Sequence, residues 1–274
     1  MPMGMASMFT NVLAVVVAIS IACIAIANSS EQRLIFRELP AQSGNAAVLK
    51  RGASPAESRD WTASFYLDEP KFCSATLIGP KVMLTAAHCL ERDEKILISI
   101  WIKRKSIETE GRCTVHPEFS VDRSNDIALC SFGVEVPVAA YERISLEPTD
   151  LPLTNKKLLL TGFGCVDHEN EVPLKKFLIG ESTITALVGE DSKYPNSIRL
   201  SGGASLCLGD SGGGAYVRLP PSKRRLIVGV NSRYLNSTSW VSSLAKSSGF
   251  VTQWALENKV TICGKDKEAP NCRQ

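Results

Sequence analysis

Short runs of apolar and β-branched residues, each followed by turn residues, recur along most of this 274-residue chain. A first set predicts strands at residues 61–67, 73–78, 82–85, 96–102, 114–115 and 127–132. After a proline-containing stretch at 133–157, a second set predicts strands at residues 158–162, 177–184, 197–200, 213–218, 226–232 and 239–244. Strands at this spacing are typical of antiparallel barrels or sandwiches, so the pattern predicts an all-β fold in two halves.

The segments outside the two strand sets have different patterns. Residues 250–260 carry apolar side chains at helical spacing, which predicts one C-terminal helix. Residues 28–60 are polar and mixed, with two glycines and two prolines, and we expect a propeptide or an irregular arm there. The stretch 133–157 is expected to cross from the first half to the second.

The first 27 residues contain no Lys, Arg, Asp or Glu, and residues 12–27 form an apolar run with Ser20 within it. That run is shorter than the roughly 20 residues a membrane-spanning helix needs. It ends in Ala25-Ile26-Ala27, a small-x-small cleavage pattern, before a polar stretch. Residues 1–27 are therefore interpreted as a secretory signal peptide, which predicts a secreted or periplasmic protein without stable membrane association. A retained anchor and lipid attachment at Cys23 are the alternatives.

Charge and cysteine content narrow the class of protein. The formal net charge is +3, and the basic clusters at 103–105 and 223–225 are short and lie between apolar runs, so no nucleic-acid partner is expected. Of nine cysteines, eight remain after the signal segment, an even number that indicates disulfides in an oxidising compartment. These cysteines are dispersed and form no Cys-x-x-Cys motif, so neither a metal site nor a cofactor is predicted.

The stretch 206–214 carries the candidate chemistry. Ser211 lies between glycines, and a serine hydroxyl becomes a good nucleophile only when a base accepts its proton. The backbone N–H groups of Gly209 and Ser211 could form an oxyanion hole in such a turn. Taken alone, residues 209–213 also satisfy the Gly-x-Ser-x-Gly pattern of α/β-hydrolases, and a plain glycine-serine loop is a third interpretation.

The histidines distinguish these interpretations. The chain has three, His88, His116 and His168, and all precede Ser211. An α/β-hydrolase places its histidine after the serine, so that interpretation fails. The order His88, Asp126, Ser211 remains, in the motifs Thr-Ala-Ala-His-Cys, Asn-Asp-Ile-Ala-Leu and Gly-Asp-Ser-Gly-Gly. His116 and His168 are expected on the surface.

With these three motifs the chain resembles the chymotrypsin/trypsin family of serine endopeptidases, from about residue 61 to residue 254. The resemblance implies two six-stranded antiparallel β-barrels with the active site between them, plus a C-terminal α-helix. It implies a peptidase domain at 48–260, with barrels at about 48–140 and 150–245 and a helix at about 249–260. Residues 28–47 would then be a propeptide or arm and 261–274 a tail. A monomer acting on protein or peptide substrates is expected.

The resemblance and the positions of the cysteines suggest four disulfides. Cys73 and Cys89 match the family's bridge that closes the loop of the catalytic histidine. The other three pairs follow from position, either between neighbouring strands, between two loops near the nucleophile, or within the tail. They are Cys113–Cys130, Cys165–Cys207 and Cys263–Cys272.

The resemblance also suggests activation and specificity residues. In the family, the acid before the serine, here Asp210, pairs with an α-amino group that an activating protease releases. Counting back from the first strand puts that position near Val48, although cleavage after Arg51 would free Gly52 instead. The primary pocket would have Ser205 at its floor and walls from Ser232, Tyr234 and Ser239. A neutral floor and a tyrosine in the wall predict a preference for small, uncharged side chains. A non-catalytic secreted homologue that binds a partner, and an esterase, are the alternatives.

Overall fold

The computed structural model describes residues 33–37, 53–55, 60–69, 71–90, 95–102, 105–166, 169, 171–219, 224–266 and 268–274. The chain divides into two units after Ser30, and all of these residues belong to the second unit, Glu31–Gln274. The predicted signal peptide, Val48 and His168 lie outside the described residues. Within those residues, no helix combines the length and the apolar character that crossing a membrane requires.

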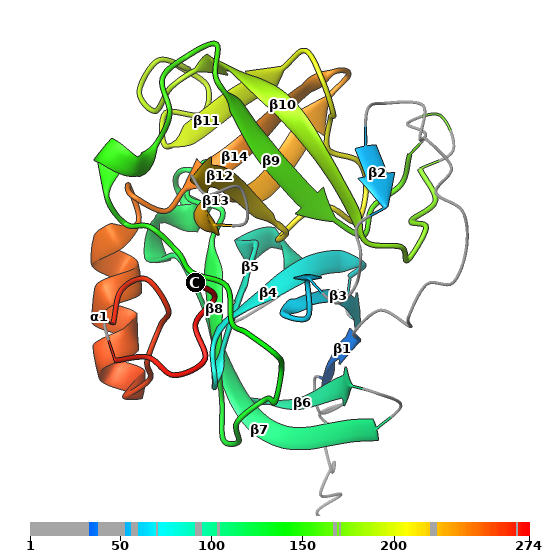
Figure 1. Ribbon diagram of the computed structural model, residues 1–274, viewed down its shortest axis with the longest axis vertical. Coiled ribbons are helices and arrows are strands. Elements are labelled where there is room, and N and C mark those ends of the chain that lie inside the picture. The colour runs from blue at the N-terminus through cyan, green and yellow to red at the C-terminus, as the bar shows by residue number, and fades with distance from the viewer. Residues whose placement is uncertain are drawn as a thin grey trace, which may run out of the picture. The chain divides into compact units, whose positions relative to one another are not determined.

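The first barrel is closed and contains seven strands (Figure 1). Their order around the barrel is β1-β3-β4-β5-β8-β7-β6, and all neighbours are antiparallel except β1 and β6, which are parallel. The strands are β1 (Arg33–Arg37), β3 (Ser64–Glu69), β4 (Cys73–Gly79), β5 (Val82–Thr85), β6 (Lys95–Ile102), β7 (Lys105–Val115) and β8 (Ala128–Phe132).

The second barrel is built from six antiparallel strands, with a short seventh strand added at one edge. The order is β11-β14-β13-β12-β9-β10-β2, and pairing of β11 with β10 closes the six-stranded part. The strands are β2 (Ala53–Pro55), β9 (Lys157–Gly162), β10 (Leu178–Ala186), β11 (Ser197–Ser201), β12 (Gly214–Leu219), β13 (Arg224–Leu235) and β14 (Thr238–Ser243). Helix α1 (Ser248–Asn258) follows the last strand.

The predicted architecture of two β-barrels and a C-terminal helix is confirmed, but the first barrel has seven strands instead of six. The additional strand β1 lies in the segment expected to be an irregular arm. Leu34 and Phe36 of β1 point into the barrel core and are almost fully buried. Strand β7 extends over eleven residues where the sequence predicted two, because the exposed charged residues Glu108, Glu110 and Arg112 interrupt any apolar run.

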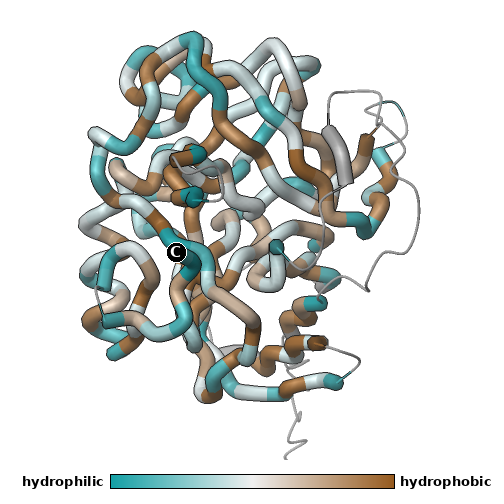
Figure 2. The backbone as a smooth tube through the Cα atoms, viewed as in Figure 1, coloured by the Kyte–Doolittle hydropathy of each residue, from teal (hydrophilic) through white to brown (hydrophobic). Residues whose placement is uncertain are grey.

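The buried side chains form two apolar clusters, and Figure 2 shows hydrophobic positions along the backbone of both barrels. The larger one spans the first barrel and continues to Val251 and Trp254 of helix α1, while the smaller one lies inside the second barrel. His116 was expected on the surface, and that prediction was wrong. It is 7% exposed and its ring lies 4.9 Å from the ring of Phe250, because helix α1 packs over this turn.

The C-terminal tail packs on the crossover segment between the barrels. Backbone hydrogen bonds join Tyr141 to Asn271 and Arg273. Beside them the fully buried carboxylate of Glu142 is paired with Arg225 at 2.5 Å and with Arg273 at 3.0 Å. The tail thus supplies one of two cations to a buried acid, which fixes it to the body of the protein.

Candidate active site

His88 lies on a single 3-10 turn, Ala87–Cys89, directly after strand β5. The disulfide from Cys89 to Cys73 on the neighbouring strand β4 holds this turn in place. The two sulfur atoms lie close to the imidazole of His88, but the disulfide occupies both, so neither is available as a thiolate ligand for a metal.

Asp126 lies two residues before the start of strand β8 and is fully buried. Its Oδ1 accepts a hydrogen bond from the His88 backbone N–H at 2.9 Å, and its Oδ2 lies 2.6 Å from His88 Nδ1. Ser232 Oγ donates to the same Oδ2 at 2.6 Å. Burial by itself raises the pKa of Asp126, but the hydrogen bonds and charge of His88 and the bond from Ser232 outweigh it and lower the pKa. The carboxylate is therefore held ionised and fixed in orientation.

Arg233 also reaches this carboxylate. Its Nη2 lies 3.8 Å from Asp126 Oδ2, and its Nε donates to Ser232 Oγ at 3.1 Å. The guanidinium stacks over the ring of Tyr194 at 4.3 Å. The sequence did not single out Arg233, since nothing local in the sequence indicates a contact with a residue more than a hundred positions earlier.

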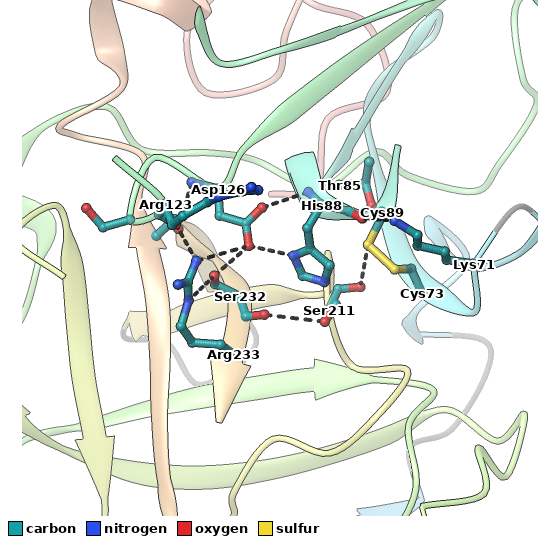
Figure 3. A network of polar contacts seen from close by, with 12 residues as sticks. Lys71, Cys73, Thr85, His88, Cys89, Arg123, Asp126, Ser211, Ser232 and Arg233 are labelled. Atoms are coloured by element: carbon teal, nitrogen blue, oxygen red, sulfur yellow. Dashed lines mark hydrogen bonds and ion pairs between the residues drawn. A yellow bond between two sulfur atoms is a disulfide. The ribbon is translucent and has the colours of Figure 1, made fainter. Parts of the chain in front are cut away.

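Ser211 lies beside the imidazole of His88, with Asp126 on the other side of the ring (Figure 3). Its Oγ donates to the carbonyl oxygen of Ser232 at 3.4 Å. The next residue, Gly212, has φ +86°, and a Cβ there would lie 2.1 Å from the carbonyl oxygen of Ser74. Glycine is therefore required for the turn that presents Ser211. The structure thus brings together the three residues that the motifs singled out.

The two amides predicted to form an oxyanion hole are adjacent to this hydroxyl. Among the described residues, the N–H groups of Gly209 and Ser211 donate to no protein acceptor, whereas the intervening Asp210 N–H donates to Cys207 O. Gly209 has φ +100°, and a Cβ there would lie 2.8 Å from the ring of Phe72. The turn therefore leaves two donors available next to Ser211.

The side chain of Asp210 is buried beneath the nucleophile turn. Its carboxylate accepts hydrogen bonds from Gly164 N at 2.8 Å and Cys207 N at 2.9 Å. Burial raises the pKa of Asp210 to about 7 despite these two bonds. A cavity of about 30 Å³ adjoins the carboxylate and is lined by residues that include Gly162 and Gly180.

Of the predicted pocket residues, Ser232 and Tyr234 lie on strand β13, Ser239 lies on strand β14, and Ser205 lies in the loop that leads into the turn of Ser211. The hydroxyl of Ser232 is engaged by Asp126, and Ser239 Oγ accepts from Leu206 N at 2.9 Å in a buried position. Tyr234 Oη donates to Glu171 Oε1 at 2.5 Å and also contacts the backbone of Leu208. Burial, followed by Glu171, raises the pKa of Tyr234 to about 12. Ser205 is partly buried.

The four disulfides in the structure are Cys73–Cys89, Cys113–Cys130, Cys165–Cys207 and Cys263–Cys272, the same pairs as expected from the sequence. The third one joins the loop after strand β9 to the segment that leads into the nucleophile turn. These two segments also supply the amides of Gly164 and Cys207 that bind Asp210. The bridge therefore holds both hydrogen-bond donors of this buried acid together.

Residues 50–253 match the family model described as Trypsin, a range that includes His88, Asp126 and Ser211. Among curated proteins, the chain is 27% identical to Kallikrein-15 from Homo sapiens over 197 residues, covering 63% of this chain and 77% of that protein. It is also 27% identical to Kallikrein 1-related peptidase b22 from Mus musculus and to Trypsin from Phaedon cochleariae. Each of those two alignments covers 57% of this chain and 69% of the relative.

Proposed function

Because the chain belongs to the trypsin family and is a serine endopeptidase, we propose that it cleaves peptide bonds through a catalytic triad of Ser211, His88 and Asp126. The observation that carries this proposal is the pair of hydrogen bonds, at 2.6 and 2.9 Å, between the buried Asp126 carboxylate and His88. They fix the imidazole so that its other nitrogen is on the side of Ser211 (Figure 3).

In the proposed reaction, Ser211 Oγ leaves its acceptor on Ser232 and transfers its proton to His88 Nε2 as it attacks the carbonyl carbon of the substrate. The resulting imidazolium then donates that proton to the leaving amine, which leaves an acyl-enzyme on Ser211. Water, activated by the same imidazole, hydrolyses the ester. Asp126 accepts the Nδ1–H bond throughout, so it selects the tautomer and stabilises the imidazolium.

The negative charge that develops on the substrate oxygen is assigned to the amides of Gly209 and Ser211. In the part of the chain that the structure describes, these two N–H groups have no protein acceptor, which supports the assignment. Such donors are already oriented before the reaction and need little reorganisation when the charge appears. Each one therefore stabilises the transition state strongly.

We assign Asp210 to activation. A carboxylate buried with only backbone amides as partners among the described residues would be stabilised by a cation, and a new α-amino group at Val48 would supply it. Strand β2 supports this, because Ala53, five residues after Val48, pairs with Gly180 at the cavity beside Asp210. Cleavage before Val48 by an activating protease is the corresponding step, and N-terminal sequencing of active enzyme tests it.

We assign the primary specificity to small, uncharged side chains. Ser205 and Ser239 carry no charge that could pair with a substrate cation. Tyr234 extends from strand β13 to Glu171 and to the backbone of Leu208, three residues before Ser211, and a side chain of this size in the pocket wall would leave less room for a substrate side chain. Tyr234 is therefore proposed as the residue that excludes large side chains.

Export through the signal peptide 1–27 and action as a secreted or periplasmic monomer complete the proposal. Four disulfides support an oxidising destination. Edman sequencing of the exported protein tests cleavage after Ala27, and size-exclusion chromatography with light scattering tests the monomeric state.

A fluorophosphonate probe tests the nucleophile, because it reacts covalently with an activated serine. We expect the full-length protein, after activation, to be labelled and to hydrolyse peptide substrates, and Ser211→Ala to do neither. A matched control is Ser106→Ala, which changes an exposed serine on strand β7, outside the triad and the pocket, and retains labelling. Absence of labelling in folded, activated protein would favour the non-catalytic binding protein instead.

A further inference from the structure

We infer that Ser74 is a positioning residue for the oxyanion hole, an inference that rests on the proposed function. Ser74 lies on strand β4 of the first barrel and is 1% exposed. It contacts the two residues of the second barrel whose amides are assigned to the oxyanion, and it does so through two different groups. The backbone N–H of Ser74 donates to Ser211 O at 2.6 Å, and its Oγ donates to Gly209 O at 2.7 Å.

The second of these contacts restrains the part of the turn that is most free to rotate. Gly209 has φ +100° and no side chain, so its own conformational preferences do not fix its peptide groups. The carbonyl that Ser74 Oγ binds belongs to the peptide unit between the amides of Gly209 and Ser211. A fixed middle unit sets the relative direction of the two donors on either side of it.

Ser74 is itself held from several directions. Its Oγ accepts a hydrogen bond from Phe163 N at 3.1 Å, and its carbonyl oxygen accepts one from Thr85 Oγ1 at 2.8 Å. The preceding residue, Cys73, is bonded to Cys89 beside the catalytic histidine. The hydroxyl is therefore a rigid point of the first barrel against which the oxyanion turn rests.

Loss of this hydroxyl should act on the transition state and spare substrate binding. The oxyanion forms only during reaction, so donors that point in the wrong direction reduce kcat and leave KM unchanged. Removal of a donor itself typically lowers turnover by about 10²–10³. Because Ser74 orients donors that remain present, we expect a smaller reduction in kcat, about tenfold.

The test compares Ser74→Ala with Ser64→Ala in the activated full-length enzyme. Ser64 is a buried serine on strand β3, 5% exposed, whose hydroxyl has no partner among the described residues, so its removal is a matched control. We expect Ser74→Ala to lower kcat about tenfold with KM within about twofold of the wild type. Its affinity for a peptide aldehyde, whose hemiacetal oxygen mimics the oxyanion, should fall by the same factor as kcat. Ser64→Ala should have the same kcat, KM and aldehyde affinity as the wild type.

Fluorophosphonate labelling and thermal unfolding accompany the kinetics. If Ser74→Ala does not fold, Ser74→Gly removes the same hydroxyl and serves for the same comparison. A kcat within twofold of the wild type, an equal loss in Ser64→Ala, or a loss confined to KM overturns the role of Ser74. An unlabelled wild-type enzyme would instead overturn the proposed function, so the two failures are distinguishable.

Discussion

Replacement of Phe36 by alanine tests whether the segment before the proposed activation site is part of the folded enzyme. Phe36 is fully buried in the first barrel, on strand β1, which is paired with β3 on one side and with β6 on the other. The sequence suggested that residues 28–47 form a propeptide or an arm. Strand β1 lies inside that stretch, so its removal would take a strand out of a closed barrel.

The size of the effect follows from the burial. Truncation of a fully buried phenylalanine to alanine lowers the free energy of unfolding by about 3–5 kcal/mol, because apolar contacts are lost and a cavity remains. For a protein of this length, that corresponds to a decrease in Tm of about 6–20 °C. Ile35 on the same strand is only partly buried, so Ile35→Ala should have a clearly smaller effect.

The assay is thermal unfolding of uncleaved wild type, Phe36→Ala and Ile35→Ala, followed by tryptophan fluorescence at one heating rate. Trp101 reports locally, since Arg37 of strand β1 stacks over its ring at 4.8 Å. If β1 is integral, the arm should also remain bound to the enzyme after cleavage before Val48 and co-elute with it under native conditions. A Tm of Phe36→Ala equal to that of the wild type would refute the reasoning, because it would show that Phe36 contributes no core packing.

Three further predictions concern the active site. Asp126→Asn should lower kcat by about 10⁴ without unfolding the protein, because the amide no longer holds the required tautomer of His88; steady-state kinetics and thermal unfolding check this. Asp210 has its folded pKa raised to about 7 from 3.8, so its contribution to stability is complete below pH 3.8 and is lost as the pH rises through 7. The Tm of uncleaved wild type relative to Asp210→Asn should therefore fall between pH 5 and pH 8, and a constant difference would contradict the burial argument. Tyr234→Gly should raise kcat/KM for substrates with phenylalanine before the scissile bond about tenfold relative to alanine substrates, and an unchanged ratio would show that Tyr234 does not limit the pocket.

The fold was predictable where a strand has an apolar run of its own. The runs at 73–78 and 82–85 coincide closely with strands β4 and β5, whose side chains are buried throughout. Most of strand β7 was missed because exposed charged residues, Glu108, Glu110 and Arg112, alternate with more buried positions, so the strand has no apolar run. Strand β1 was not predicted because it is only five residues long and lies within a polar segment. Its parallel pairing with β6 also joins stretches that are distant in the sequence.

The candidate site was predictable where its residues belong to short sequence motifs. His88, Asp126 and Ser211 each have characteristic neighbours in the sequence, and the order of the motifs excluded the alternative hydrolase fold. Ser74 and Arg233 have no such motif. Their importance arises from contacts with residues more than a hundred positions away, which only the packing of one barrel against the other creates.

Those contacts reveal a reciprocal arrangement of the two barrels. Asp126, the proposed catalytic acid, comes from the first barrel, and serines of the second barrel bind it: Ser232 at its carboxylate and Ser242 at its backbone amide. Ser211, the proposed nucleophile, comes from the second barrel, and Ser74 of the first binds the turn that carries it. Neither barrel alone therefore contains a fully oriented catalytic group. A small shift of one barrel against the other would disturb the acid and the oxyanion turn together. Substitutions at this interface should therefore reduce kcat even where the loss of stability is too small to unfold either barrel.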